Sequence, residues 1–118
     1  MTDRRIRIQL ADDHSIVRAG VRRVLETVAR FEVVGESDRG DATLEMLAKL
    51  QPDVLILGLN MPGGDGFAVL HEARDLVPEV RIVVLTMHTQ AEYVTRAIRE
   101  GADGYLLKDL AVQDLIAA

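Results

Sequence analysis

The sequence predicts an α/β domain in which helices cover both faces of a parallel sheet. Apolar runs typical of strands alternate five times with amphipathic segments typical of helices, and this alternation is characteristic of a doubly wound sheet. The run at residues 54–57 is apolar without a break, as expected of a central strand that is buried on both faces. We therefore expect five parallel strands.

In the first half of the chain, we expect the first strand at residues 6–12 and the first helix at 14–29. This helix has an apolar stripe at helical spacing, formed by Val17, Val21, Val24 and Val28. The second strand is expected at residues 31–36, and a polar loop leads from it into a helix at 42–50. Pro52 follows this helix and ends it.

The second half repeats the same alternation after the central strand. A helix is expected at residues 66–76 and the fourth strand at 80–86. The next helix, at 90–100, ends before Gly101, a residue type that commonly follows a helix. The fifth strand is expected at residues 104–107, so that the apolar runs account for all five strands.

A last helix is expected to begin near Val112, and the sequence stops at Ala118 about two turns later. We interpret this ending as a truncation inside or just after the helix. The chain of 118 residues is long enough for one domain with its own core. We therefore expect residues 1–118 to form a single domain of a longer protein.

The composition restricts the class of protein. With 48% hydrophobic and 28% charged residues, the chain is typical of a globular domain. The absence of cysteine excludes disulfides and thiol chemistry, no apolar run is long enough to span a membrane, and we expect a cytoplasmic protein. The net charge of -5 argues against binding to nucleic acid by this chain itself. The one basic cluster is interpreted as a solvated helix face, formed by Arg18, Arg22 and Arg23.

Charged residues follow the first and last expected strands. Asp12 and Asp13 end the first apolar run, and Lys108 ends the last one. Because the carboxyl ends of parallel strands form one crevice, where open α/β sheets bind ligands, these side chains are expected to gather there. Gly58 ends the central strand, at a position where this arrangement requires a third acid.

Four motifs, taken in order, resemble those of the receiver domain of two-component response regulators: Asp12-Asp13, Leu59-Asn60-Met61-Pro62-Gly63, Leu85-Thr86 and Leu107-Lys108-Asp109. The details around them, among them Val17-Arg18-Ala19-Gly20, are similar to the NarL/FixJ (LuxR-type) subfamily, in which the receiver precedes a helix-turn-helix DNA-binding domain. The resemblance covers essentially the whole chain. It implies a flavodoxin-like fold with strand order 2-1-3-4-5.

The resemblance also implies what the site residues do. Asp12, Asp13 and the backbone carbonyl of Asn60 would hold Mg²⁺, a cation that prefers oxygen ligands. Thr86 would offer a hydroxyl, and Lys108 a mobile positive charge, to the phosphoryl oxygens. Phosphoryl transfer onto a carboxylate needs such a cation and such donors in addition to a nucleophile.

Tyr105 resembles the aromatic switch residue that moves inward when Thr86 is pulled toward the phosphoryl group. Plainer interpretations stay open for each of these residues. Thr86 is also a common strand residue, and a lone aromatic such as Tyr105 can serve packing alone. Asp12 and Asp13 can be a polar strand end that caps the following helix.

Gly58 is the departure from the family pattern, because it occupies the position of the aspartate that accepts the phosphoryl group. Glycine has no nucleophile, and no nearby acid is an obvious substitute, since Asp53 lies at the other end of the strand and Asp65 in a glycine-rich loop. The chain is either a natural receiver that lost phosphorylation or a variant whose aspartate was changed. Glycine also loosens a strand, which favours the natural sequence.

The function predicted from the sequence is therefore a non-enzymatic signalling module, the receiver of a transcriptional response regulator that cannot be phosphorylated in this form. Its expected partners are a sensor histidine kinase, a second copy of itself in a homodimer, and DNA through a C-terminal domain outside this chain. Any Mg²⁺ site should be weakened or absent. The alternative is a stand-alone adaptor, a pseudo-receiver that acts by protein contacts.

Enzyme classes with a similar sheet fit the sequence less well. Phosphatases of the haloacid type need a second acid two residues after the nucleophile, and Asp12-Asp13-His14 lacks that spacing. A dinucleotide-binding fold would have a glycine-rich turn after the first strand. The three histidines lie in different segments and are expected to be surface residues and not metal ligands: His14, His71 and His88.

Overall fold

The protein is described by a computed structural model, which covers residues 5–63, 65–86 and 91–107. A parallel sheet of five strands in the order β2-β1-β3-β4-β5 forms its centre, which confirms the predicted flavodoxin-like fold. The strands are β1 (Ile6–Ala11), β2 (Phe31–Ser37), β3 (Val54–Gly58), β4 (Arg81–Thr86) and β5 (Gly104–Leu107).

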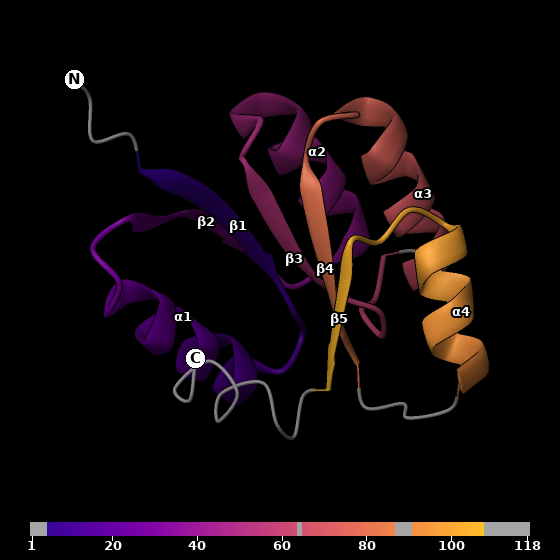
Figure 1. The fold of residues 1–118 in the computed structure, drawn as a ribbon, viewed down its shortest axis with the longest axis horizontal. Helices are drawn as coiled ribbons and strands as arrows, with labels where there is room; N and C mark the ends of the chain where they lie inside the picture. Colours follow the sequence, from indigo (N-terminus) through magenta and orange to yellow (C-terminus); the bar gives the residue numbers. More distant parts are fainter. Residues whose placement is uncertain (1–4, 64, 87–90, 108–118) are drawn as a thin grey trace.

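Helices cover both faces of the sheet, as predicted. Helix α1 lies on one face, and the other three described helices lie on the opposite face (Figure 1). The helices are α1 (Ser15–Glu26), α2 (Gly40–Leu50), α3 (Gly66–Leu76) and α4 (Ala91–Arg99). The helix predicted near Val112 lies outside the described residues. No helix in the described ranges has the length and apolar character that crossing a membrane requires.

Two apolar clusters form the core, one on each face, because alternate residues of a strand point to opposite sides. Under α1, the strands contribute Ile8, Leu10, Ile56 and Leu85, which pack with Val21 and Leu25. Under α2, α3 and α4, they contribute Leu55, Leu57, Ile82 and Val84. The central strand β3 is thus buried on both sides, as its unbroken apolar run predicted.

Helix α1 ends at Glu26, whereas the sequence predicted a helix to residue 29. The chain turns here, and the Val28 amide donates to the Leu25 carbonyl at 3.1 Å. Val28 is 40% exposed and Leu25 is 3% exposed, so the predicted stripe through Val28 is wrong. The apolar spacing of the sequence continues to Val28, but the helix has ended by then, and the turn at this residue leads directly into β2.

Helix α2 begins at Gly40 instead of residue 42 and ends at Leu50 as predicted. Gln51 follows in the left-handed conformation with φ 46°, immediately before Pro52. The strands β1 and β3 end at Ala11 and Gly58. Asp12 therefore lies just beyond its strand, at the first residue of the loop.

Candidate functional site

The carboxyl ends of four strands lie side by side. Residue pairing places Ala11 of β1 beside Leu57, Gly58 of β3 beside Leu85, and Thr86 of β4 beside Leu107. After β1 the chain continues to β2 at one edge of the sheet, and after β3 it continues to β4 and β5 toward the other edge. The crevice outside β1 and β3 is therefore the position at which folds of this kind bind ligands.

Asp12 and Asp13 begin the loop between β1 and α1. The Asp12 side chain is fully buried, and the Asp13 side chain is 31% exposed. The Asp12 Oδ1 atom accepts a hydrogen bond from the His14 amide at 2.7 Å, so one acid does bind the backbone at the helix start. Burial of a carboxylate is costly without compensating partners. A polar strand end alone would not require a buried acid, which favours a functional role for Asp12.

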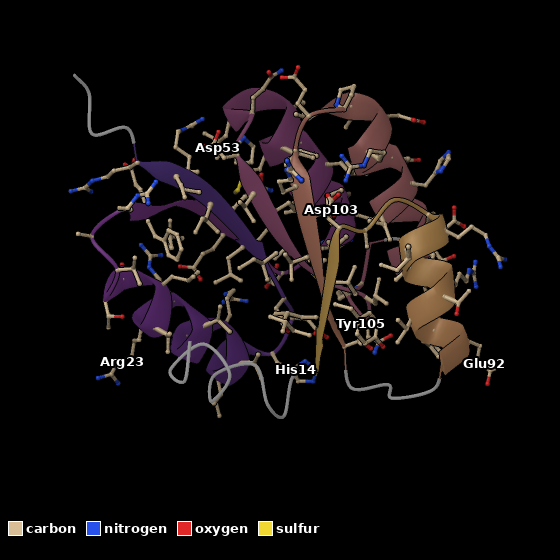
Figure 2. All side chains as sticks on the ribbon, in the orientation of Figure 1. His14, Arg23, Asp53, Glu92, Asp103 and Tyr105 are labelled. Carbon is tan, nitrogen blue, oxygen red and sulfur yellow. The ribbon has the colours of Figure 1, made fainter. Side chains whose placement is uncertain are left out.

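His14 brings an imidazole to this pair of acids. Its Nδ1 atom lies 3.0 Å from Asp13 Oδ1 and 3.3 Å from Asp12 Oδ1. The side chain is 50% exposed, as predicted for a surface residue, but the ring faces both carboxylates. Figure 2 shows His14 at the opposite end of the sheet from Asp53. Sequence reasoning missed this contact, although the position of His14 directly after the two acids was a signal for it.

Gly58 lies against the Asp12 carboxylate. A Cβ atom built on Gly58 would lie 3.3 Å from Asp12 Oδ2 and 3.3 Å from the Ala11 carbonyl oxygen. These contacts are tighter than an ordinary van der Waals separation of about 3.5–4.0 Å. A side chain at this position would require Asp12 to move by a few tenths of an ångström.

The loop after β3 holds Asn60, the predicted carbonyl ligand. The Leu59 amide donates to the Leu85 carbonyl at 3.2 Å, which ties the start of the loop to β4. Its far end returns to the same point, because a Cβ atom on Gly66 would lie only 2.0 Å from the Leu59 carbonyl oxygen. This close approach requires glycine at the start of α3. Asn60 thus lies on a short, fixed loop two residues beyond Gly58.

Thr86 and Tyr105 form a pair next to this crevice. Thr86 is fully buried at the end of β4, and the Tyr105 hydroxyl is hydrogen-bonded to it. The Tyr105 ring also packs against the core under α2, α3 and α4. Burial raises the pKa of Tyr105 above its usual value, and the hydrogen bond with Thr86 offsets part of this rise. Packing and the hydrogen bond therefore hold Tyr105 inward together.

Lys108, the last predicted site residue, lies outside the described residues. The described members nevertheless stand in the order that the motifs predicted along adjacent strand ends. The sequence pattern of the response regulator receiver domain matches residues 8–118. The chain belongs to the response regulator receiver domain family.

Relatives of this receiver include proteins named as response regulators and transcriptional regulatory proteins. The nitrate/nitrite response regulator NarL of Escherichia coli K12 is 40% identical over 111 residues, which are 94% of this chain and 51% of that protein. The transcriptional regulatory protein DegU of Brevibacillus brevis is 36% identical over 118 residues, 100% of this chain and 50% of that protein. The chain thus spans about half the length of the curated relatives it matches.

Solved structures agree with this placement in the NarL/LuxR family. The signal receiver domain of the putative response regulator NarL from Mycobacterium tuberculosis matches with a TM-score of 0.88 and 35% identity, covering 97% of this chain and 92% of that one. The non-phosphorylated receiver domain of the stress response regulator RcsB from Escherichia coli matches with a TM-score of 0.89 and 35% identity, covering 97% and 89%.

The donor atoms in this receiver do not fit the oxygen-only magnesium site that the family resemblance implies. Asp12 and Asp13 provide carboxylate oxygens, but Gly58 provides no side-chain donor, and among the described residues the imidazole nitrogen of His14 joins the two acids. Mg²⁺ prefers oxygen ligands in octahedral geometry. The donor set therefore lacks the third acid of the family's site and is poorer in negative charge than that site.

Neither of the other two acids considered as substitutes lies in the crevice with a side chain available for phosphoryl transfer. Asp53 Oδ2 accepts from the Arg7 amide at 2.8 Å, before β3 begins. Asp65 Oδ1 accepts from the Phe67 amide at 3.2 Å and caps helix α3. Both carboxylates therefore have structural roles, in agreement with the sequence analysis.

Arg18 supports the site from helix α1. Its Nη1 atom donates to the Asp12 carbonyl at 2.6 Å, and its Nε atom donates to Glu36 Oε1 at 3.0 Å. Arg22 also binds Glu36. The basic cluster is therefore a partly exposed helix face, as predicted: Arg18 and Arg22 form ion pairs there, and Arg23 is exposed. Arg18 fixes the backbone from which the Asp12 carboxylate projects.

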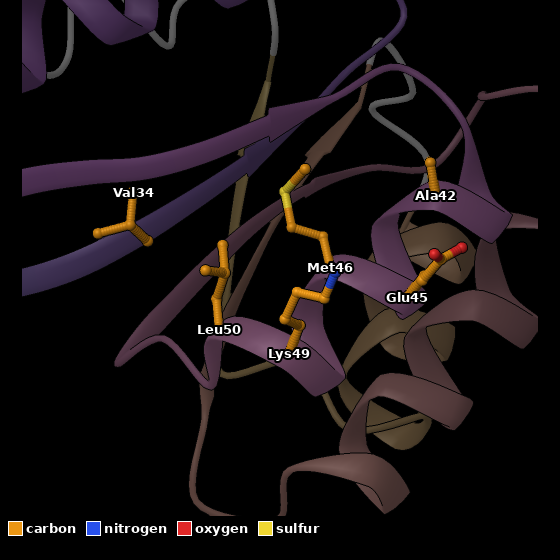
Figure 3. Close-up of a pocket in the computed structure, with 6 residues that line it drawn as sticks. All are labelled: Val34, Ala42, Glu45, Met46, Lys49 and Leu50. Atoms are coloured by element: carbon orange, nitrogen blue, oxygen red, sulfur yellow. The ribbon is translucent and has the colours of Figure 1, made fainter.

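A second hollow, of about 450 Å³, lies at the edge of the sheet between α2 and β2 (Figure 3). Its lining is mainly aliphatic and consists of Val34, Ala42, Glu45, Met46, Lys49 and Leu50. Glu45 and Lys49 have opposite charges at helical spacing, which is typical of a solvated helix surface. This hollow offers no group of converging donors comparable to the carboxyl end of the sheet.

Proposed function

We propose that this chain is the receiver of a two-component transcriptional regulator that acts without accepting a phosphoryl group. Gly58 is the observation on which the proposal rests. It lies at the carboxyl end of the central strand, where the receiver pattern has its acceptor, and the Asp12 carboxylate lies against it. Transfer to a carboxylate requires an oxygen nucleophile at the end of this strand. Glycine provides none.

The remaining site residues then have structural roles and make protein contacts, and they do not take part in phosphoryl transfer. The loss of the acid lowers the negative charge of the site, and affinity for Mg²⁺ follows ligand charge, so Mg²⁺ binding is weakened or absent. Thr86 and Tyr105 keep their hydrogen bond and inward packing without a phosphoryl signal. Signalling depends on protein contacts, and the chain is not an enzyme.

The partners follow from the kind of protein to which the relatives belong. A regulator of this type works in the cytoplasm with a sensor histidine kinase, forms a homodimer, and reaches DNA through a C-terminal domain that follows residues 1–118. The first relatives are named transcriptional or response regulators and are about twice as long as this chain. The acidic charge of -5 supports DNA binding through another domain.

Incubation with acetyl phosphate and Mg²⁺, followed by intact-mass measurement, tests the proposal. The mass of the chain should not change. The Gly58→Asp variant should gain one phosphoryl group, once Asp12 has shifted to admit the side chain, and Gly58→Asn should gain none because its amide is not a nucleophile. A phosphoryl group on the unchanged chain, mapped to Asp53 or Asp65, would contradict the proposal.

The second candidate function is that of a stand-alone adaptor. Gly58 favours it equally, because an adaptor also acts without phosphorylation. The reading frame of the parent gene distinguishes the two. A helix-turn-helix domain encoded after Ala118 would support the transcriptional regulator, and a stop codon there would support the adaptor.

A further inference from the structure

Two carboxylates and one imidazole converge where the β1–α1 loop meets the crevice. The donor atoms of Asp12, Asp13 and His14 all lie within 4.8 Å of one another. The Asp12 side chain is fully buried, while Asp13 is 31% and His14 is 50% exposed. The inner acid is thus fixed by its surroundings, and the two outer groups are accessible from solvent.

Two of the three distances between these donor atoms are close to what a small metal ion requires. Around a tetrahedral ion with bonds of about 2.0–2.2 Å, the ligand atoms lie about 3.3–3.6 Å apart. His14 Nδ1 lies 3.3 Å from Asp12 Oδ1 and 3.0 Å from Asp13 Oδ1. The three donor atoms lie within 4.8 Å of one another, so rotation of the exposed Asp13 and His14 side chains would bring all three around one ion.

The chemistry of the donors selects the class of ion. Imidazole is a common ligand of zinc, copper, nickel and iron, whereas magnesium and calcium are bound through oxygen. An aspartate at position 58 would supply a further oxygen and draw an ion toward β3. Without it, the donor that joins Asp12 and Asp13 among the described residues is the imidazole nitrogen of His14.

We propose that this receiver binds a divalent transition ion of the zinc class through Asp12, Asp13 and His14. The remaining coordination positions are filled by water. The site replaces the magnesium site of the family with one of different selectivity, and Gly58 is the cause of the change. The alternative is that His14 only contacts the two acids and binds no metal, and the titrations below distinguish the two cases.

The role of His14 as a metal ligand is tested by titration of the 118-residue chain. Binding of Zn²⁺ is measured by calorimetry, and binding of Co²⁺ by its visible absorption. Zn²⁺ should bind with one ion per chain and at least about tenfold more tightly than Mg²⁺, following the order of affinities for divalent ions. His14→Asn should weaken Zn²⁺ binding by at least about tenfold, because even supporting residues of metal sites have effects of this size. Its thermal unfolding should match that of the unchanged chain, because His14 is half exposed.

A matched control is available on helix α3. His71 also lies near two acids, at 3.6 Å from Asp75 Oδ2 and 3.6 Å from Glu100 Oε1, and is 62% exposed. His71→Asn should leave Zn²⁺ affinity unchanged. Equal Zn²⁺ affinity in His14→Asn and the unchanged chain would overturn the proposal, and so would a Zn²⁺ affinity no greater than that for Mg²⁺.

Gly58→Asp tests the cause of the selectivity. The ratio of Zn²⁺ to Mg²⁺ affinity should fall in this variant, because the restored acid gives Mg²⁺ a further oxygen ligand. An unchanged ratio would refute the role of Gly58 in the change of metal. These titrations use metal ions alone, so a negative result would not affect the proposed loss of phosphorylation, which is measured by mass.

Discussion

The amino and carboxyl ends of the sheet both have aspartates, with different partners. At the amino end, Asp53 and Asp103 stand just before β3 and β5, and each accepts a hydrogen bond from the backbone of a neighbouring strand, at the Arg7 amide (2.8 Å) and the Ile82 amide (2.9 Å). At the carboxyl end, Asp12 and Asp13 follow a strand and face an imidazole. An acid before a strand anchors the sheet, whereas acids after a strand form the candidate site.

Arg74 of helix α3 adds further hydrogen bonds at the amino end of the sheet. Its guanidinium donates to the Val80 carbonyl at 2.6 Å, to the Gly101 carbonyl at 2.7 Å and to Asp103 Oδ2 at 2.6 Å. One side chain thus joins α3 to the segments that enter β4 and β5. The carboxyl end, by contrast, has a glycine at its centre.

Replacement of Arg74 should have the largest effect on stability. Arg74→Met should lower the free energy of unfolding by about 2–3 kcal/mol, because it removes the Arg74 donor from partly buried carbonyls and one of the two donors to Asp103 Oδ2. Urea denaturation would measure the loss, and Arg23→Met, at an exposed position on α1, is the matched control. A loss no larger than that of the control would show that the amino end does not depend on this anchor.

The pH dependence of stability should show a smaller effect of the same anchor. Burial opposes the charge on Asp103, but the Ile82 amide and the Arg74 guanidinium together hold the pKa of its carboxyl below the usual value. Its contribution is therefore present above the unfolded-state pKa of about 3.9 and is lost as the pH falls through the folded-state value.

Urea denaturation of Asp103→Asn and the unchanged chain from pH 7 to pH 3 would measure this contribution. The unchanged chain should be the more stable of the two at pH 7, and the difference should shrink below about pH 4. The side chain is 39% exposed, so solvent screening keeps the effect small. A difference that is constant over this range would mean that the charge on Asp103 does not stabilise the fold.

The apolar runs predicted the strands, and the family resemblance implied their order. The full length of α3 was also predicted, and the structure shows that Asp65 caps this helix. The sequence did not predict the end of α1, where Val28 continues the helical spacing into a turn. Local patterns carry no information about which side chains a turn will expose. Because the helix ends at Glu26, Leu25 is buried and Val28 is exposed.

The position of the site at the carboxyl ends of the strands was predictable from the sequence. The order of the motifs along parallel strands was enough to bring Asp12, Gly58 and Thr86 to one edge. The contacts of Arg18 with the Asp12 carbonyl and with Glu36 depend on the packing of α1 against β2, which no motif encodes. The prediction for Lys108 stays open, since it lies outside the described residues.

We propose that Gly58, which cannot accept a phosphoryl group, disconnects phosphoryl chemistry from the pair formed by Thr86 and Tyr105. The most direct test compares ¹H–¹⁵N correlation spectra of the unchanged chain and Gly58→Asp before and after addition of acetyl phosphate with Mg²⁺. The Thr86 and Tyr105 amide signals should stay in place in the unchanged chain and should shift in Gly58→Asp. A shift of both signals in the unchanged chain, of the size seen in the variant, would contradict the claim.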